Sequence, residues 1–226
     1  MNLEGYEEQP LTRLTASVIQ APYYNVRHNR LTEHQRESLN SFTKQFGDNF
    51  DYFHNASFNF TVEDLIPILK QEKRDFNFDV CMIDYGQILT SKRKFEGLRH
   101  EQAYIHRGLA TMAGELDCAM VTVAQGNRET QEKNANSSAL IRGVDISECF
   151  EIIRASATVL TLNRSLKDQE MDRVKILLDK QRDGRTNIVE ICKTSFQKMC
   201  FYGHESEGLG FMTTKQYLEE AKQEKI

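Results

Sequence analysis

Residues 78–87 read Phe78-Asp79-Val80-Cys81-Met82-Ile83-Asp84-Tyr85-Gly86-Gln87, and this stretch decides the fold that the sequence predicts. The apolar run Val80–Ile83 predicts a short strand buried on both faces, as in a parallel sheet. Asp84 follows it directly. An acid at the carboxyl end of a parallel strand lies where open α/β sheets bind ligands, and it can hold a hydrated magnesium ion beside a nucleotide. The alternative is an ordinary core strand followed by a loop aspartate.

Length and composition limit the class of protein. The chain has 226 residues, of which 27% are charged and 39% hydrophobic, and its net charge is −4. These values predict a globular protein of one or two domains whose nucleic-acid contacts come from a local patch. Because no apolar run approaches the roughly 20 residues of a membrane span and no signal peptide is present, we expect no membrane partner and a cytoplasmic location. The five cysteines lack C-x-x-C spacing, which favours reduced thiols over a zinc site.

The remaining pattern alternates helices with strands. Apolar spacing predicts a helix over 11–19, and threonine caps predict helices after Thr32 and Thr61, with Pro67 kinking or shortening the latter through Lys73. A longer helix is expected over 100–116. Strands are expected over 118–125, 157–163, 173–180, 187–192 and 199–202. This order predicts an α/β fold with a mainly parallel sheet, flanking helices and a C-terminal antiparallel hairpin at Asp183-Gly184.

Three motifs, in the correct order, resemble those of the DnaB-like replicative helicases. Met82–Gln87 resembles the Walker B segment I-D-Y-L-Q, although Gly86 stands where the family has a larger apolar residue. Val121–Arg128 resembles V-x-x-x-S-Q-L-N-R. Lys180-Gln181-Arg182-Asp183-Gly184 resembles K-Q-R-N-G. The resemblance extends over about residues 2–203 and implies a RecA-like ATPase fold that uses ATP and Mg²⁺.

The resemblance also implies roles for single residues. Asp84 would hold Mg²⁺ through water, and Gln125 would sense the γ-phosphate, since an amide can both donate and accept. Glu4, in a weaker match to S-L-E-M, would activate the attacking water; an acid in a disordered N-terminus is the alternative. Lys180 and Arg182 would reach the γ-phosphate bound by the neighbouring subunit. Residues two apart on a strand share a side, so both cations are expected together; surface charges on a hairpin are the alternative.

A loop in the second half of the chain is the expected DNA contact. Residues 126–150 correspond to the family's DNA-contacting loops in the central channel. Arg128, Lys133 and Arg142 are its candidate residues for binding the backbone of single-stranded DNA. Solvated charges on a surface loop are an equally good interpretation. The family's own pattern is altered here at 142–147, so the individual roles stay open.

The sequence contains no phosphate-binding G-x-x-x-x-G-K-[ST] motif. We therefore expect residues 1–204 to form a RecA-like domain incomplete at its N-terminus, with 205–226 as a peripheral, helical tail. The predicted function is the C-terminal part of a hexameric, ATP-dependent 5′–3′ replicative helicase, inactive until a partner segment or subunit supplies the P-loop. If phage-encoded, it would act in the host cytoplasm.

Two other functions stay open. The first is a non-catalytic, truncated relative that binds intact helicase subunits and modulates them. The second is a fragment of a RadA- or KaiC-type ATPase of the same fold. Retention of Glu4, Asp84, Gln125, Lys180 and Arg182 favours the helicase, because a decoy needs none of them.

Overall fold

The chain folds into two compact units. The computed structural model describes residues 1–3, 6–55, 60–126, 132, 139–145, 150–202 and 211–213. Unit 1 comprises Met1–Ala124 with Gln197–Met199, and unit 2 comprises Gln125–Phe196 with Cys200–Ile226. The domain boundary predicted at residue 204 falls outside the described residues. In the predicted helical tail, the described residues Phe211–Thr213 form a strand, β7.

Local sequence signals set the helices of unit 1. Thr32 caps α3 with both bonds of a capping box, and the Thr61 hydroxyl accepts from the Asp64 amide at the start of α4. Pro67 does not shorten α4, which continues three residues past the predicted end at Lys73 to Phe76. The helices of unit 1 are α1 (Glu8–Val18), α2 (Tyr23–Arg27), α3 (Glu33–Phe46), α4 (Val62–Phe76) and α5 (Leu98–Glu115), with short 3-10 turns at Gly47–Asn49 and Gly86–Ile88.

A small parallel sheet lies at the centre of unit 1. β1 (Val80–Ile83) pairs with β2 (Ala119–Thr122), residue for residue, from Val80↔Ala119 to Ile83↔Thr122. The N-terminal residues extend this sheet, because Asn2 forms parallel bridges both to Asp84 and to His54. We expected residues 1–5 to be too short for an element of their own, but residues 1–3 pair on both sides.

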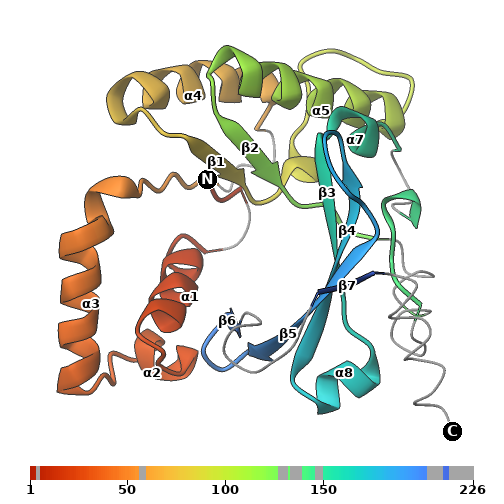
Figure 1. The fold of residues 1–226 in the computed structure, drawn as a ribbon. Coiled ribbons are helices and arrows are strands. Elements are labelled where there is room, and N and C mark those ends of the chain that lie inside the picture. Colours follow the sequence, from red (N-terminus) through yellow and green to blue (C-terminus); the bar gives the residue numbers. More distant parts are fainter. Residues whose placement is uncertain are drawn as a thin grey trace, which may run out of the picture. The chain divides into compact units, whose positions relative to one another are not determined.

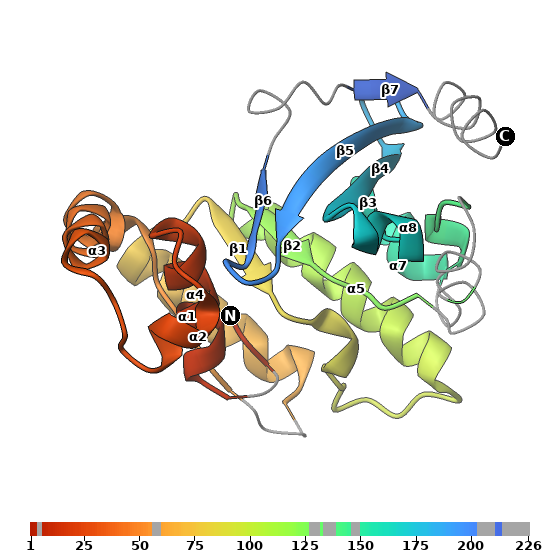
Figure 2. The same cartoon turned by 90° about the horizontal axis from the view of Figure 1, so that it is seen from below.

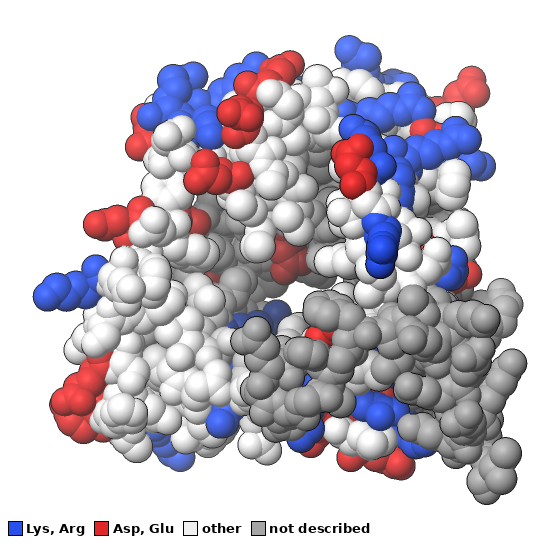
Figure 3. Space-filling model, in the orientation of Figure 1, with Lys and Arg blue, Asp and Glu red and all other residues white. Residues whose placement is uncertain are grey.

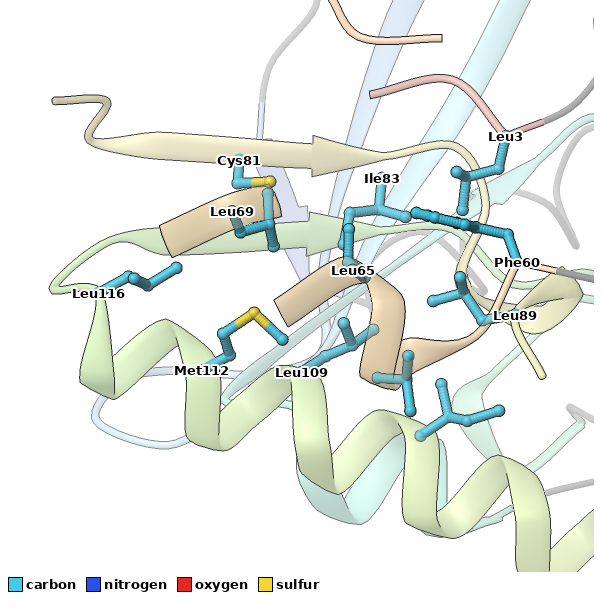
Figure 4. Packing of buried hydrophobic residues seen from close by; sticks show 12 residues of the cluster. Leu3, Phe60, Leu65, Leu69, Cys81, Ile83, Leu89, Leu109, Met112 and Leu116 are labelled. Carbon is cyan, nitrogen blue, oxygen red and sulfur yellow. The ribbon is translucent and has the colours of Figure 1, made fainter. Parts of the chain in front are cut away.

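The core of unit 1 lies on one side of this sheet. Cys81 and Ile83 point toward α4 and α5, which both lie on that side of β1 and β2 (Figure 1, Figure 4). On the opposite face, the side chains of Val80 and Met82 remain 51% and 63% exposed. The predicted burial on both faces is therefore wrong: both helices pack on one face, and burial alternates along the strand.

Unit 2 is built on an antiparallel sheet. Its strands are β3 (Thr158–Asn163), β4 (Arg173–Gln181), β5 (Ile188–Ser195), β6 (Cys200–Tyr202) and β7. They pair in the order β3-β4-β5, and β6 and β7 pair with opposite ends of β5, as Figure 2 shows. The predicted hairpin is present as β4 and β5, but it is part of this larger sheet. Its short helices are α7 (Phe150–Ala155) and α8 (Leu166–Glu170).

A buried ionic cluster fixes the start of β4. Asp168, at the N-terminus of α8, is fully buried, and it accepts from Lys175 Nζ at 2.6 Å and from Arg173 Nε at 2.7 Å. Ser165 Oγ caps α8 and donates to the same carboxylate at 2.5 Å. A buried charge is stable only when it is paired and hydrogen-bonded. This cluster therefore holds α8 and β4 together.

Three general expectations can be compared with the described residues. Cys81, Cys118, Cys192 and Cys200 are free thiols there, two of them buried. No helix in the described ranges is long and apolar enough to cross a membrane. On the face shown in Figure 3, basic and acidic side chains both occur, in keeping with a net charge of −4.

Candidate functional site

Asp84 lies exposed at the carboxyl end of β1, where the sequence predicted a functional acid. Its backbone is fixed from the N-terminal strand: the Asp84 amide donates to the Met1 carbonyl at 3.1 Å, and the Leu3 amide donates to the Asp84 carbonyl at 2.8 Å. The backbone is therefore anchored while the carboxylate faces solvent. Glu4, the next residue along the N-terminal strand, lies outside the described residues.

Thr122 connects the end of β2 to the turn that follows Asp84. Its hydroxyl donates to the Ile83 carbonyl at 3.0 Å and accepts from the Gly86 amide at 2.8 Å. The sequence analysis missed this residue, whose only signal is a hydroxyl within an apolar strand. Through these two bonds Thr122 sets the direction in which the chain leaves β1.

The same contacts explain why Gly86 departs from the family pattern. A Cβ at Gly86 would lie 2.8 Å from Thr122 Oγ1 and 3.2 Å from His106 Cε1. Both distances are shorter than ordinary van der Waals contacts. The larger apolar residue of the family therefore does not fit here unless Thr122 and His106 move.

Two buried polar residues of α5 lie beneath this turn. Gln102 Nε2 donates to the Gln87 carbonyl at 3.0 Å, while Gln102 Oε1 and His106 Nε2 have no hydrogen-bond partner among the described residues. Burial lowers the pKa of His106 to about 4, so the ring is neutral at physiological pH. The turn after Asp84 thus rests on uncharged polar groups.

Lys180 is engaged within unit 2. Its ammonium donates to the carbonyls of Ile153 at 2.6 Å and Ser156 at 2.7 Å, and lies 3.4 Å from that of Arg154. These carbonyls lie at the C-terminal end of α7, where a cation is favoured by the unpaired carbonyl groups. Lys180 therefore closes this helix end in the structure.

Arg182 differs from Lys180 although the two are only two residues apart. Its residue is exposed, and its backbone amide donates to the Ala157 carbonyl at 3.0 Å. Within the described ranges its guanidinium makes no hydrogen bond or ion pair. Of the two cations that the sequence grouped, Arg182 is the one available to a ligand.

The predicted DNA-contacting residues are only partly described. Arg128 and Lys133 lie outside the described residues. Arg142 is described: its guanidinium donates to Asn187 Oδ1 at 2.6 Å and lies 3.5 Å from Asp179 Oδ1, which ties it to β4 and to the β4–β5 turn. Gln125 is exposed and belongs to unit 2, because β2 ends at Thr122, three residues before the predicted strand end.

The donor set at Asp84 fits one kind of metal ion. Among the described residues no three His, Cys, Asp or Glu side chains come together as a metal-binding group. This argues against a site made of protein ligands alone in that part of the chain. It is compatible with Mg²⁺, which keeps several waters and is held by one or two carboxylates together with the phosphates of a substrate.

Known proteins match the chain in both sequence and structure. The profile of the family described as DnaB-like helicase C terminal domain matches residues 1–201. The replicative DNA helicase DnaB of Mycobacterium leprae is 22% identical over 194 residues, covering 84% of this chain and 32% of that protein. The DnaB of Helicobacter pylori is 24% identical over 181 residues, covering 77% of this chain and 36% of the relative. The chain thus spans about a third of the length of these relatives.

Two solved structures share the fold. One, an isolated ATPase domain, superposes with a TM-score of 0.76 at 19% identity, covering 89% of this chain and 72% of that one. A DnaB-like replicative helicase, from a study of its interactions with primase, gives a TM-score of 0.75 at 19% identity, covering 89% and 49%. These similarities confirm the RecA-like α/β fold. Together with the profile match over residues 1–201, they show that the chain belongs to the family of DnaB-like helicase C-terminal domains.

Proposed function

We propose that this chain supplies the part of an ATP site that completes a hexameric replicative helicase, with the phosphate-binding loop contributed by a partner segment. One observation carries the proposal: the family profile matches residues 1–201, yet no G-x-x-x-x-G-K-[ST] motif occurs in the 226 residues. Without the backbone amides and lysine of such a loop, the triphosphate of ATP has no binding site here.

Asp84 is assigned to Mg²⁺. Its exposed carboxylate at the carboxyl end of a parallel strand, on a backbone anchored by Met1 and Leu3, suits a hydrated cation beside a nucleotide. When bound, Mg²⁺ neutralises charge on the β- and γ-phosphates. Thr122 positions the turn behind Asp84. Gln125 is assigned to sensing the γ-phosphate, and Glu4 to activating water.

Arg182 is assigned to the nucleotide of a neighbouring subunit. An exposed guanidinium without an internal partner among the described residues can donate to the charge that develops on the transferring phosphoryl group. Lys180 is assigned a positioning role, because its ammonium already binds the carbonyls of Ile153 and Ser156. The geometry therefore separates a reacting cation from a supporting one.

DNA contact is assigned to the segment 126–150. Arg128 and Lys133 are the main candidates for binding the phosphates of single-stranded DNA. Arg142 also belongs to this set, although its contacts with Asp179 and Asn187 hold it in place. With few cations and a net charge of −4, the isolated chain should bind DNA weakly and less as salt rises.

The experiment that tests this function is complementation. The purified chain is expected to show no ATP hydrolysis alone, and to gain hydrolysis and 5′–3′ unwinding when mixed with a segment or subunits that carry a P-loop. Substituting Asp84→Asn should abolish the gain. If the mixture stays inactive and the chain instead inhibits an intact helicase, the chain is a modulator. Hydrolysis by the chain alone would contradict the proposal directly.

A further inference from the structure

Unit 1 contains a cavity that continues the line of the N-terminal strand. It has a volume of about 460 Å³. Met1 lies at one end, residues within 48–53 line one side, residues 76–82 line the other, and Leu69 and Glu72 of α4 complete the lining. We call this cavity the strand slot. All of its lining belongs to unit 1.

The hydrogen bonds at Met1 show which way a ladder runs into the slot. On one side, the Met1 amine donates to the Met82 carbonyl at 2.8 Å, and the Asp84 amide donates to the Met1 carbonyl at 3.1 Å. On the other side, the Asn2 amide donates to the Phe53 carbonyl at 2.8 Å, and the Asn55 amide donates to the Asn2 carbonyl at 3.0 Å. Residues 1–3 therefore run parallel between β1 and residues 53–55.

Extending this register places further strand residues in the slot. Asn2 pairs with both Asp84 and His54. A strand running backward from Met1 would therefore meet 82, 80 and 78 on one side and 52, 50 and 48 on the other, because parallel partners advance in step. These numbers fall within the two segments that line the cavity. The slot is thus the unfilled continuation of an existing ladder.

The edge of β1 that faces the slot has backbone groups to offer. Alternate residues of a parallel strand bond to opposite neighbours. The Ala119 amide donates to the Asp79 carbonyl, so the odd-numbered residues of β1 bond to β2, while Met82 and Asp84 bond toward Met1. The Val80 amide and carbonyl and the Met82 amide therefore face the slot, and within the described part of the chain no strand pairs with them there. Unpaired groups at a strand edge are a template for a further strand.

The lining defines the chemistry of the occupant. Apolar side chains, among them Phe50, Phe53 and Leu69, favour an apolar strand, and the slot ends near Phe78, whose carbonyl accepts from Lys73 Nζ at 2.5 Å. Four carboxylates line the slot, from Asp48, Asp51, Glu72 and Asp79, and no Lys or Arg does. Burial, followed by the hydrogen bond and the charge of Asp51, raises the pKa of Glu72, as expected for carboxylates without a cation close by.

We propose that the strand slot binds an extended, apolar strand of about five residues that carries a lysine or arginine and runs parallel to β1. Only the identity of its source rests on the proposed function: the strand belongs to the partner segment that carries the phosphate-binding loop. Filling the slot extends the sheet by pairing the free edge of β1 and residues 48–53 at once. The partner is thereby held next to the strand that bears Asp84.

A peptide experiment on the full chain tests the slot without any nucleotide. The probe is fluorescein-labelled Lys-Val-Leu-Val-Phe-amide, followed by fluorescence anisotropy. Saturable binding is expected. A peptide with proline in place of the leucine should not bind, because proline removes the donor that pairs with β1, and a peptide with glutamate in place of the lysine should bind about tenfold more weakly at low salt. Binding of all three peptides alike would overturn the proposal, as would absence of binding.

Protein variants and amide exchange locate the binding. Glu72→Lys should weaken binding of the lysine peptide, while Glu115→Lys, an exposed acid outside the slot, should not. In hydrogen exchange, the amides of Val80 and Met82 should slow at least tenfold on saturation, whereas those of Cys81 and Ile83, already bonded to β2, should change little. Binding without protection of Val80 and Met82 would place the peptide elsewhere and refute the slot.

These outcomes are separable from those of the complementation assay. Peptide binding with protection of the β1 amides, but no hydrolysis on complementation, would refute the proposed function and leave the slot standing. Restored hydrolysis with no peptide binding and no protection would refute the slot and leave the function standing.

Discussion

Lys180 and Arg182 should separate cleanly when each is replaced by methionine. The two cations stand two residues apart in a motif that the sequence interprets as one functional pair. The structure gives them different tasks: the Lys180 ammonium binds carbonyls at the end of α7, whereas Arg182 is exposed. Methionine keeps the apolar stem of each side chain and removes only the cation and its donors.

The magnitude follows from the contacts. Lys180 makes two short charged hydrogen bonds, to Ile153 and Ser156. Hydrogen bonds to a charged group contribute about 1.5–3 kcal/mol each at most, and a cation at a helix C-terminus about 0.3–1 kcal/mol. Because both carbonyls are partly hydrated after the substitution and the side chain regains rotamer freedom, we expect Lys180→Met to cost about 2–4 kcal/mol of unfolding free energy. Arg182→Met should cost less than about 0.5 kcal/mol, as exposed substitutions do.

The assay is urea unfolding of the full chain, followed by far-ultraviolet circular dichroism because the sequence contains no tryptophan. In the complemented enzyme, Arg182→Met should lower hydrolysis by about 10³-fold or more at nearly unchanged nucleotide binding. Arg182→Lys should not restore it, since an ammonium lacks the planar fork of a guanidinium. Equal stability of the two methionine variants would refute the assignment of Lys180. Full activity of Arg182→Met would refute that of Arg182.

Three further predictions concern folding and pH. Gly86→Ala should lower the unfolding free energy by about 1–3 kcal/mol in urea titrations, because the new Cβ meets Thr122 at 2.8 Å; a neutral result would mean that the turn adapts freely. Burial alone would raise the pKa of Asp168, but hydrogen bonds led by that of Lys175 lower it from 3.8 to about 2, so a stabilisation of about 2.5 kcal/mol present above pH 4 should be lost between pH 4 and 2. Asp168→Asn should remove that pH dependence, and parallel curves would contradict the ionic cluster. Burial lowers the pKa of His106 from 6.5 to about 4, so the unfolded chain binds the extra proton and about 3 kcal/mol of stability should be lost as the pH falls from 6.5 to 4. His106→Gln should flatten this part of the stability curve, and an unchanged slope would show that the ring protonates freely in the folded state.

The sequence alone predicted those features that depend on near neighbours. Thr32 with Gln35, and Thr61 with Asp64, placed two helix starts correctly because a cap bonds to amides two or three residues away. The strand at 80–83 and the hairpin around Asp183 follow from a short apolar run and a turn. The order of three motifs also predicted the family, which the profile over residues 1–201 confirmed. The assignments of Glu4, Gln125, Arg128 and Lys133 stay predictions.

Only the tertiary structure decided which groups meet across long distances in the chain. Residues 1–3 form a strand because their partners near His54 and Asp84 lie more than 50 positions away, where no local pattern can indicate them. Lys180 binds carbonyls 24 and 27 residues upstream, so its difference from Arg182 is invisible in the motif that contains both. Burial on one face of β1 likewise depends on where α4 and α5 pack. The physical reason is the same in each case: backbone groups and apolar faces are satisfied by whichever segment folding brings against them, and sequence spacing records only the contacts within a few residues.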